Sequence, residues 1–244
     1  MSGLRAERDG PVYRVTLARP ERRNAFDAAL IAELTDAFSD VGEARAVLLE
    51  GEGSSFCAGA DVEWQRSSID LSYEENVEDA MRLYRMLEAI DGCPAPVVAR
   101  VQGFALGGGS GVVACCDVAV ATADAVFGFS EVRLGIIPAV ISPFVLSKIG
   151  PGAARRYFLT GERFDAKTAL RIGLVHELGD GVEHVVEAIL ASGPEAVRAA
   201  KRLVRERPAG RALAEIAAAR RTSDEGQEGL RAFLERRPAR WSGA

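Results

Sequence analysis

Apolar residues recur at helical spacing in two long segments of the chain. Asp27, a residue type that caps helix N-termini, precedes one of them. The apolar positions of this first segment are Leu30, Ile31, Leu34 and Phe38. Residues 73–90 show the same period. The side chains expected to turn toward the core there are Met81, Tyr84, Leu87, Ala89 and Ile90.

Short apolar runs lie between and beyond these segments and predict strands. They span residues 11–17, 46–50, 96–101 and 117–121. Because such strands alternate with helices, we expect an α/β fold.

From Pro143 onward the pattern is mainly helical. Asp165 is placed to cap a short helix that Gly173 ends, and Pro194 is placed to begin another. Residues 211–236 predict one long helical region.

The composition is that of a globular protein of one large domain or two small ones. Of its 244 residues, 48% are hydrophobic and 27% charged, and the net charge is −5. Such a chain has no general attraction to nucleic acid or anionic membranes, and no apolar run reaches transmembrane length. The first twenty residues lack an apolar signal segment, and the four cysteines lack metal-binding spacing. We therefore expect a cytoplasmic protein with no nucleic-acid or membrane partner.

Three consecutive glycines, Gly107, Gly108 and Gly109, follow the predicted strand at residues 96–101 and precede an apolar helix. Glycine lets backbone N–H groups approach a ligand closely, and a helix N-terminus adds partial positive charge. A second segment of this kind spans residues 55–61. Two backbone donors that converge on one carbonyl oxygen would stabilise an enolate. The alternative for the glycines alone is a tight turn that binds nothing.

Other kinds of site fit the sequence poorly. The glycines match neither the dinucleotide fingerprint nor the phosphate loop. Ser110 invites comparison with a hydrolase nucleophile, but the nucleophile elbow needs glycine where this chain has Val112. His176 and His184 have no partner at useful spacing, so we expect neither a Ser-His mechanism nor a metal site.

Glu131 stands among apolar residues, which makes it the candidate acid–base group. These neighbours are Phe127, Phe129, Val132, Leu134, Ile136 and Ile137. A carboxylate held among such side chains loses solvation, so its pKa should rise, and a raised pKa suits proton transfer at carbon. The alternative is a surface glutamate paired with Arg133.

Several motifs resemble those of the crotonase, or enoyl-CoA hydratase/isomerase, superfamily. They are FCAGAD at residues 56–61, GFALGGG at 103–109, RPERRNA at 19–25, FGFSEVRLGIIP at 127–138 and EGQEGLRAFLE at 225–235. The resemblance covers nearly the whole chain in order. It implies an α/β fold of the crotonase type, with a ββα spiral core at residues 1–190 and a C-terminal helical lobe at residues 191–244. In that family the lobe joins subunits, so the resemblance implies a homotrimer or a dimer of trimers.

The resemblance also implies roles for individual residues. The N–H groups of Ala60 and Gly108 would bind the thioester oxygen of an acyl-CoA, and Glu131 would exchange a proton with the substrate. Coenzyme A would be part of the substrate, with no separate cofactor. The residues implied for CoA or substrate binding are Arg22, Asn24, Ala25, Ala58, Ala60, Asp61, Val62, Gly107 and Gly108.

Gly111 departs from the pattern of the best-known hydratases, which carry a second glutamate at this position. Two carboxylates divide the work of hydration, because one activates water and the other protonates Cα. With glycine here, three accounts stay open. Glu131 acts alone, another acid such as Glu63, Glu74 or Glu75 reaches the site, or the protein does not hydrate its substrate.

Three functions therefore stay open: a 2-enoyl-CoA hydratase, a Δ3-Δ2 enoyl-CoA isomerase with Glu131 as its sole proton shuttle, and a non-catalytic CoA-binding scaffold. Residues 107–117, 130–143 and 153–160 resemble a bacterial branch of methylglutaconyl-CoA and carboxygeranoyl-CoA hydratases, which also has glycine at this position. This second resemblance favours a hydratase. In such an enzyme we expect Gly111 to make room for a bulkier or carboxylated acyl group.

Overall fold

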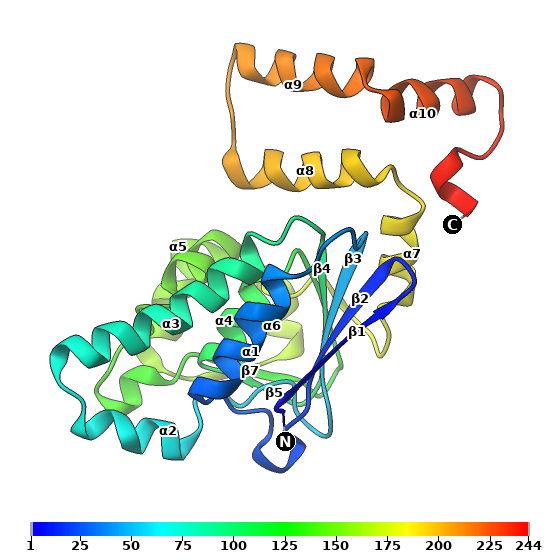
Figure 1. The fold of residues 1–244 in the computed structure, drawn as a ribbon. Coiled ribbons are helices and arrows are strands. Elements are labelled where there is room, and N and C mark those ends of the chain that lie inside the picture. The colour runs from blue at the N-terminus through cyan, green and yellow to red at the C-terminus, as the bar shows by residue number, and fades with distance from the viewer. Residues whose placement is uncertain (1, 244) are drawn as a thin grey trace.

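A six-stranded sheet forms the centre of the molecule, whose computed structural model describes residues 2–243 (Figure 1). Its strands stand in the order β1 (Leu4–Asp9), β2 (Val12–Leu17), β3 (Ala46–Gly51), β4 (Val97–Val101), β6 (Val118–Ala121) and β9 (Glu177–Leu178). β1 and β2 form an antiparallel pair, and the later neighbours are parallel. Parallel strands need crossover connections, which helices supply, so the predicted α/β fold is confirmed.

The strands of this sheet face two different apolar layers, because successive side chains of a strand point to opposite faces. On one face Val47 and Leu49 pack into a core shared with α1 (Ala28–Ser39), α3 (Tyr73–Asp91) and α4 (Gly108–Cys115). On the other face Leu48 and Val98 pack against α7 (Glu183–Leu190). Figure 1 shows the sheet between these layers, and α5 (Ser142–Thr160) packs on α4.

A second, three-stranded sheet leads to Glu131. It consists of β5 (Phe104–Leu106), β7 (Val126–Gly128) and β8 (Arg163–Asp165), with β8 antiparallel to β7. Phe127 and Phe129 flank Gly128 and are fully buried, with ring centroids 5.9 and 6.0 Å from that of Phe164. A 3-10 helix at Glu131–Leu134 follows directly. The carboxyl group of Glu131 is therefore carried by a backbone that the aromatic cluster holds in place.

The capping residues predicted from the sequence begin and end helices as expected. Asp27 accepts a hydrogen bond from the Leu30 N–H at the start of α1. Asp165 accepts one from the Thr168 N–H at the start of α6 (Ala166–Ile172), which Gly173 ends in a left-handed conformation. Pro194–Glu206 forms α8, with proline at its first position.

The C-terminal lobe consists of α8, α9 (Arg211–Thr222) and α10 (Asp224–Leu234). The single long helical region predicted for residues 211–236 is therefore wrong. Ser223 leaves the helical conformation and its hydroxyl accepts a hydrogen bond from the Gly226 N–H, which starts a new helix. Gly226 permits the turn, because a Cβ atom there would lie 2.0 Å from the Arg220 carbonyl oxygen.

The lobe is held together and to the sheet layer largely by charged groups. The Glu225 carboxylate of α10 accepts hydrogen bonds from the first-turn N–H groups of α8, at Glu195 and Ala196. Lys201 of α8 pairs with Asp117 at 2.7 Å, between Nζ and Oδ2. Figure 1 shows α9 and α10 running back over α8, on the side away from the sheet.

Three features of the fold differ from expectation or were not predicted. β1 has a single buried residue, Leu4, so it carries no apolar alternation that would mark it as a strand. On α3, Met81 is 36% exposed and Met86 fully buried, so the core face is turned away from the predicted Met81. The second sheet consists of strands too short to show a period.

Each helix in the described part of the chain is too short or too polar to cross a bilayer.

Candidate active site

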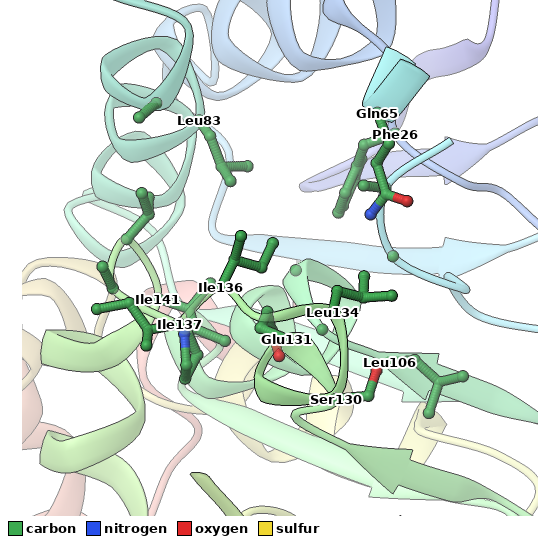
Figure 2. A pocket seen from close by; sticks show the side chains of 18 of the residues that line it. Phe26, Gln65, Leu83, Leu106, Ser130, Glu131, Leu134, Ile136, Ile137 and Ile141 are labelled. Carbon is green, nitrogen blue, oxygen red and sulfur yellow. The ribbon is translucent and has the colours of Figure 1, made fainter. Parts of the chain in front are cut away.

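A cavity of about 450 Å³ lies where the glycine-rich turn, the loop before α2 (Val62–Ser67) and Glu131 meet (Figure 2). Its lining includes the predicted residues Ala58, Ala60, Gly107, Gly108 and Glu131. The structure thus brings together residues that lie far apart in the sequence, including the backbone donors and the carboxyl group that the sequence predicted.

The two glycine-containing segments touch because glycine leaves no side chain between them. A Cβ atom on Gly109 would lie 2.3 Å from the Cys57 carbonyl oxygen, so only glycine allows α4 to approach residues 55–61 this closely. Gly59 adopts a φ of +94°, in which a residue with a side chain would be strained. This close packing brings both Ala60 and Gly108 to the lining of one cavity.

The N–H groups of Ala60 and Gly108 donate no hydrogen bond to any residue within 2–243. The adjacent Gly107 N–H, by contrast, donates to the Gly128 carbonyl oxygen at 2.8 Å. Gly108 is the first residue of α4, where N–H groups lack partners inside the helix and partial positive charge gathers. The cavity therefore offers two unoccupied donors that could bind one oxygen atom.

Glu131 lines the cavity and carries an unpaired carboxyl oxygen. Its Oε2 atom is buried and has no hydrogen-bond partner within the described chain. Burial raises the pKa of Glu131 above its usual value, against a smaller lowering by a backbone hydrogen bond. No ion pair joins it to Arg133 among residues 2–243, so the alternative of a charge-paired surface glutamate does not describe this side chain.

Three glycines leave space for the side chains that shape the cavity. A Cβ atom on Gly107 would lie 3.3 Å from Glu131 Oε1, and one on Gly108 would lie 3.3 Å from the Phe26 ring. A Cβ atom on Gly111 would lie 2.5 Å from Ile141 Cγ2. The expectation that Gly111 makes room for the acyl group is therefore wrong, because Ile141 fills that space.

The acids proposed to replace a second glutamate do not line the cavity. Glu63 pairs with Arg66 at 3.2 Å, and Glu75 closes a capping box with Ser72 at the start of α3. Glu74 is exposed in the first turn of the same helix.

Asp79 is the other carboxylate in the cavity lining within residues 2–243, and the sequence did not single it out. It is already engaged, since it pairs with Arg82 at 3.2 Å and accepts a hydrogen bond from the Trp64 indole at 3.4 Å. Glu131 is therefore the carboxyl group in the lining that is free to act on a substrate.

Five predicted CoA-binding residues lie outside the cavity lining: Arg22, Asn24, Ala25, Asp61 and Val62. The Asn24 side chain is fully buried and donates to the carbonyl oxygens of Glu52 and Ser55, so it supports the turn and is not free for a ligand. The Asp61 carboxylate is buried and pairs with Arg22 at 3.0 Å. Burial opposes its ionisation, but the hydrogen bond from the Glu63 N–H and the Arg22 guanidinium together hold the pKa of Asp61 below its usual value.

The serine and the cysteine near the cavity are not activated nucleophiles. Ser110 is fully buried and its hydroxyl donates to the Ala105 carbonyl oxygen at 2.6 Å. Burial raises the pKa of Cys57 to about 12, so the thiol stays protonated. His176 accepts a hydrogen bond from the Ala119 N–H, away from both. No three potential metal ligands gather anywhere in residues 2–243.

Several lining residues could not be singled out from the sequence. Among them are Phe26, Gln65, Leu83, Ser130 and Ile141. Figure 2 shows Phe26 and Gln65 on one side of the cavity, with Ile137 and Ile141 on the other side of Glu131. Phe26 directly follows the singled-out residues 19–25 and Ser130 directly precedes Glu131, so their positions in the sequence could have pointed to them.

Comparison with known proteins agrees with this geometry. Residues 7–244 match the family model described as enoyl-CoA hydratase/isomerase. The chain is 35% identical over 239 residues to a crotonyl-CoA hydratase of Syntrophomonas wolfei, covering 91% of this chain and 90% of that protein.

Two solved structures have nearly the same fold. An enoyl-CoA hydratase from Shewanella pealeana superposes with a TM-score of 0.93 at 37% identity, covering 98% of this chain and 96% of that one. Pseudomonas aeruginosa AtuE superposes with a TM-score of 0.94 at 36% identity, covering 98% and 99%. The chain is therefore an enzyme of the enoyl-CoA hydratase/isomerase family, in the crotonase superfamily.

Proposed function

We propose that this enzyme adds water to, or removes it from, a 2-enoyl-CoA thioester, with Glu131 as its acid–base group. The observation that carries the proposal is the buried, unpaired carboxyl oxygen of Glu131 in a cavity that also holds two unoccupied N–H donors. An oxyanion needs the donors, and proton transfer to carbon needs the carboxyl group. A relative named for crotonyl-CoA hydration adds support.

In this mechanism the thioester oxygen accepts hydrogen bonds from the N–H groups of Ala60 and Gly108. The ionised Glu131 takes a proton from water as the water oxygen bonds to Cβ, and the electron pair of the double bond moves toward the thioester oxygen. Glu131 then delivers the proton to Cα. Since burial raises its pKa, Glu131 holds the proton more readily between these two steps than an exposed glutamate would.

One carboxyl group performing both transfers is also the requirement for moving a double bond, so a Δ3-Δ2 isomerase is the second candidate. The absorbance of the enoyl-thioester band separates the two. Loss of the band with crotonyl-CoA supports a hydratase, and its appearance with a 3-enoyl-CoA supports an isomerase. No change with either substrate would favour the CoA-binding scaffold or a different acyl group.

The carboxylated acyl groups of methylglutaconyl-CoA and carboxygeranoyl-CoA form a second candidate substrate class. The observation that favours them is Arg163, which lines the cavity and forms no ion pair with residues 2–243. Its guanidinium lies over the Phe104 ring, 5.6 Å from the centroid. We propose that CoA itself lies along the turn at Arg22 and the loop from Ala58 to Val62, which the Arg22–Asp61 pair joins.

We also propose that the enzyme is a homotrimer or a dimer of trimers, assembled through α8, α9 and α10. The support is the exposure of apolar side chains along these helices: Leu203, Val204, Leu213, Leu230, Phe233 and Leu234. Apolar side chains at this density gain free energy when another surface covers them. Light scattering at micromolar concentration tests this, and a mass near the 26.0 kDa of one chain would refute it.

A further inference from the structure

Gly111 and Ile141 fit together as a pair. Gly111 is buried within α4, and a Cβ atom on it would lie 2.5 Å from Ile141 Cγ2 and 3.0 Å from Ile141 Cβ. Carbon atoms of packed side chains normally keep about 3.5 to 4.0 Å apart. The side chain of Ile141 therefore occupies the space that any larger residue at position 111 would need.

Ile141 cannot easily withdraw from this position. It is the residue before the first turn of α5, where its carbonyl oxygen accepts a hydrogen bond from the Val145 N–H at 3.1 Å. The two atoms nearest Gly111 are Cβ, which side-chain rotation does not move, and the branch carbon Cγ2, which moves only if χ1 changes, and β-branching restricts χ1. Ile141 is 3% exposed, which means that it forms the wall of the cavity and does not project across it.

This wall lies at the apolar side of the cavity. Gly111 follows Gly108 by three residues in the same helix, so both lie on one helix face. Figure 2 shows Ile137 and Ile141 together on one side of the Glu131 carboxyl group. The cavity lining also includes the apolar residues Leu83, Ile136 and Val140.

Arg163, the cationic residue of the cavity lining among residues 2–243, lies near Gly128 and away from Ile141. The Arg163 stem and Leu106 both border Gly128, since a Cβ atom there would meet each at 3.4 and 3.5 Å. Figure 2 shows Leu106 across Glu131 from Ile141. A substrate carboxylate placed against Ile141 would thus lose its hydration without gaining a counter-charge.

We propose that Ile141, seated against Gly111, is a specificity-determining residue: it limits the length of the acyl group and selects uncharged hydrocarbon chains. The inference rests on the proposed function only in that the cavity receives the acyl part of a CoA thioester. Gly111 then serves to admit Ile141, and a carboxylate at position 111 is excluded by that same side chain.

The main experiment compares Ile141→Ala with Ile149→Ala, the same truncation at a buried position of α5 outside the cavity lining. The measured quantity is the ratio of kcat/KM for trans-2-hexenoyl-CoA to that for crotonyl-CoA. We expect Ile141→Ala to raise the ratio about tenfold or more, the usual effect of changing apolar contacts in a substrate pocket. Ile149→Ala should leave it within about twofold. Because both substrates meet the same preparation, a partly unfolded variant does not alter the ratio.

Binding of the unreactive thioesters hexanoyl-CoA and butyryl-CoA, measured by calorimetry, separates this inference from the proposed reaction. If no enoyl-CoA is converted but Ile141→Ala still shifts the ratio of dissociation constants toward hexanoyl-CoA, the proposed reaction fails and the inference stands. If Ile141→Ala shifts neither ratio more than Ile149→Ala does, the inference is overturned whatever the reaction is.

Two further variants test the pairing itself. Gly111→Ala should lower both Tm and activity, and the double variant Gly111→Ala/Ile141→Ala should recover Tm relative to the sum of the single effects. A Gly111→Ala protein as stable and selective as the unchanged enzyme would overturn the pairing. Assay of 3-methylglutaconyl-CoA tests the substrate class: a kcat/KM tenfold above that for trans-2-hexenoyl-CoA in the unchanged enzyme would overturn the selection of uncharged chains.

Discussion

The sheet region and the C-terminal lobe differ in how far they bury their apolar side chains. Around the sheet, Phe26, Phe127 and Phe129 are at most 1% exposed, and the helices that cover the sheet belong to the same chain. In the lobe, Phe233 and Leu234 are 80% and 78% exposed, and α8 and α9 have no buried residue. The sheet region buries a core of its own, although apolar side chains such as Ile69, Tyr73 and Ile137 stay exposed at its surface, whereas the lobe leaves several of its large apolar side chains exposed.

This difference separates two properties of the molecule. Among residues 2–243 the cavity lining comes from the sheet region, so packing within that region shapes the cavity. The lobe attaches through α8 by charged contacts such as Lys201–Asp117 and Arg205–Asp91, and contributes no lining residue from the described chain. Substitutions in the two regions should therefore change different measured quantities, catalysis in one and assembly in the other.

The largest effect on catalysis is expected from Glu131→Gln. Turnover of the enoyl-CoA should fall by about a hundredfold or more, the usual scale for losing an acid–base group. The fold and the affinity for butyryl-CoA should stay close to those of the unchanged enzyme. Asp79→Asn is the matched control, since Asp79 lines the same cavity but is engaged with Arg82. Similar losses for both variants, in steady-state assays, would contradict a special role for Glu131.

A comparison of Gly108→Pro with Gly108→Ala tests the backbone donor. Each variant adds a Cβ atom near Phe26, but only proline removes the N–H group, and proline is tolerated at the first position of a helix. We expect Gly108→Pro to turn over about a hundredfold more slowly than Gly108→Ala, the scale for losing one oxyanion donor. Equal rates for the two folded variants would mean that the oxygen binds elsewhere.

Charge placed on the lobe should change assembly and leave the sheet region intact. Leu234→Asp introduces a carboxylate among the exposed apolar side chains of α10, so the proposed interface would have to bury it. We expect the mass measured by light scattering to fall toward the 26.0 kDa of one chain. Leu159→Asp, at a 76% exposed site on α5, is the control and should keep the larger mass. Unchanged mass in the Leu234 variant would place the interface elsewhere.

The pH dependence offers a smaller and more graded test. Glu131 must be ionised to take a proton from water, and burial raises its pKa. We expect kcat/KM to fall as the pH is lowered through that pKa, with a midpoint above the value of about 4.3 for an unperturbed glutamate. A midpoint at or below the unperturbed value would show that another group, or an exposed carboxylate, controls the rate.

The same pKa fixes the sign of an effect on stability. A carboxyl group whose pKa is raised by folding stabilises the folded state below its unfolded pKa, and that contribution is lost as the pH rises through the folded pKa. At pH 7 Glu131→Gln should therefore unfold at the same or a higher denaturant concentration than the unchanged enzyme. This advantage should disappear near pH 4, and a destabilised variant at pH 7 would contradict the burial of an ionised carboxylate.

The sequence predicted helices whose ends are marked by capping residues. Asp27, Asp165 and Pro194 each satisfy or remove N–H groups at a helix start, so they can be recognised locally. β1 was missed because a single one of its residues is buried. The break at Ser223 was missed because α9 and α10 have similar helical compositions, although Ser223 is a capping residue type and the close contact of Gly226 with Arg220 fixes the turn.

The residues of the candidate site also fall into two groups, those recognisable from the local sequence and those that depend on packing. Glu131 and the glycines are visible in the sequence because their residue types are unusual in an apolar setting. Ile141 is an ordinary apolar residue, and its contact with Gly111 depends on how α5 packs on α4. Asn24 was predicted to bind a ligand, and its burial against the carbonyl oxygens of Glu52 and Ser55 follows only from the fold.

The most direct test of the central claim is exchange of the Cα hydrogens of butyryl-CoA with deuterium oxide, followed by mass spectrometry. In the proposed mechanism, exchange requires an enolate held by Ala60 and Gly108 and a proton carried by Glu131, whether the enzyme hydrates or isomerises its natural substrate. We predict exchange by the unchanged enzyme and a rate about a hundredfold lower for Glu131→Gln. Equal exchange rates in the two proteins, or no exchange by the unchanged enzyme, would contradict the assignment of Glu131 as the acid–base group.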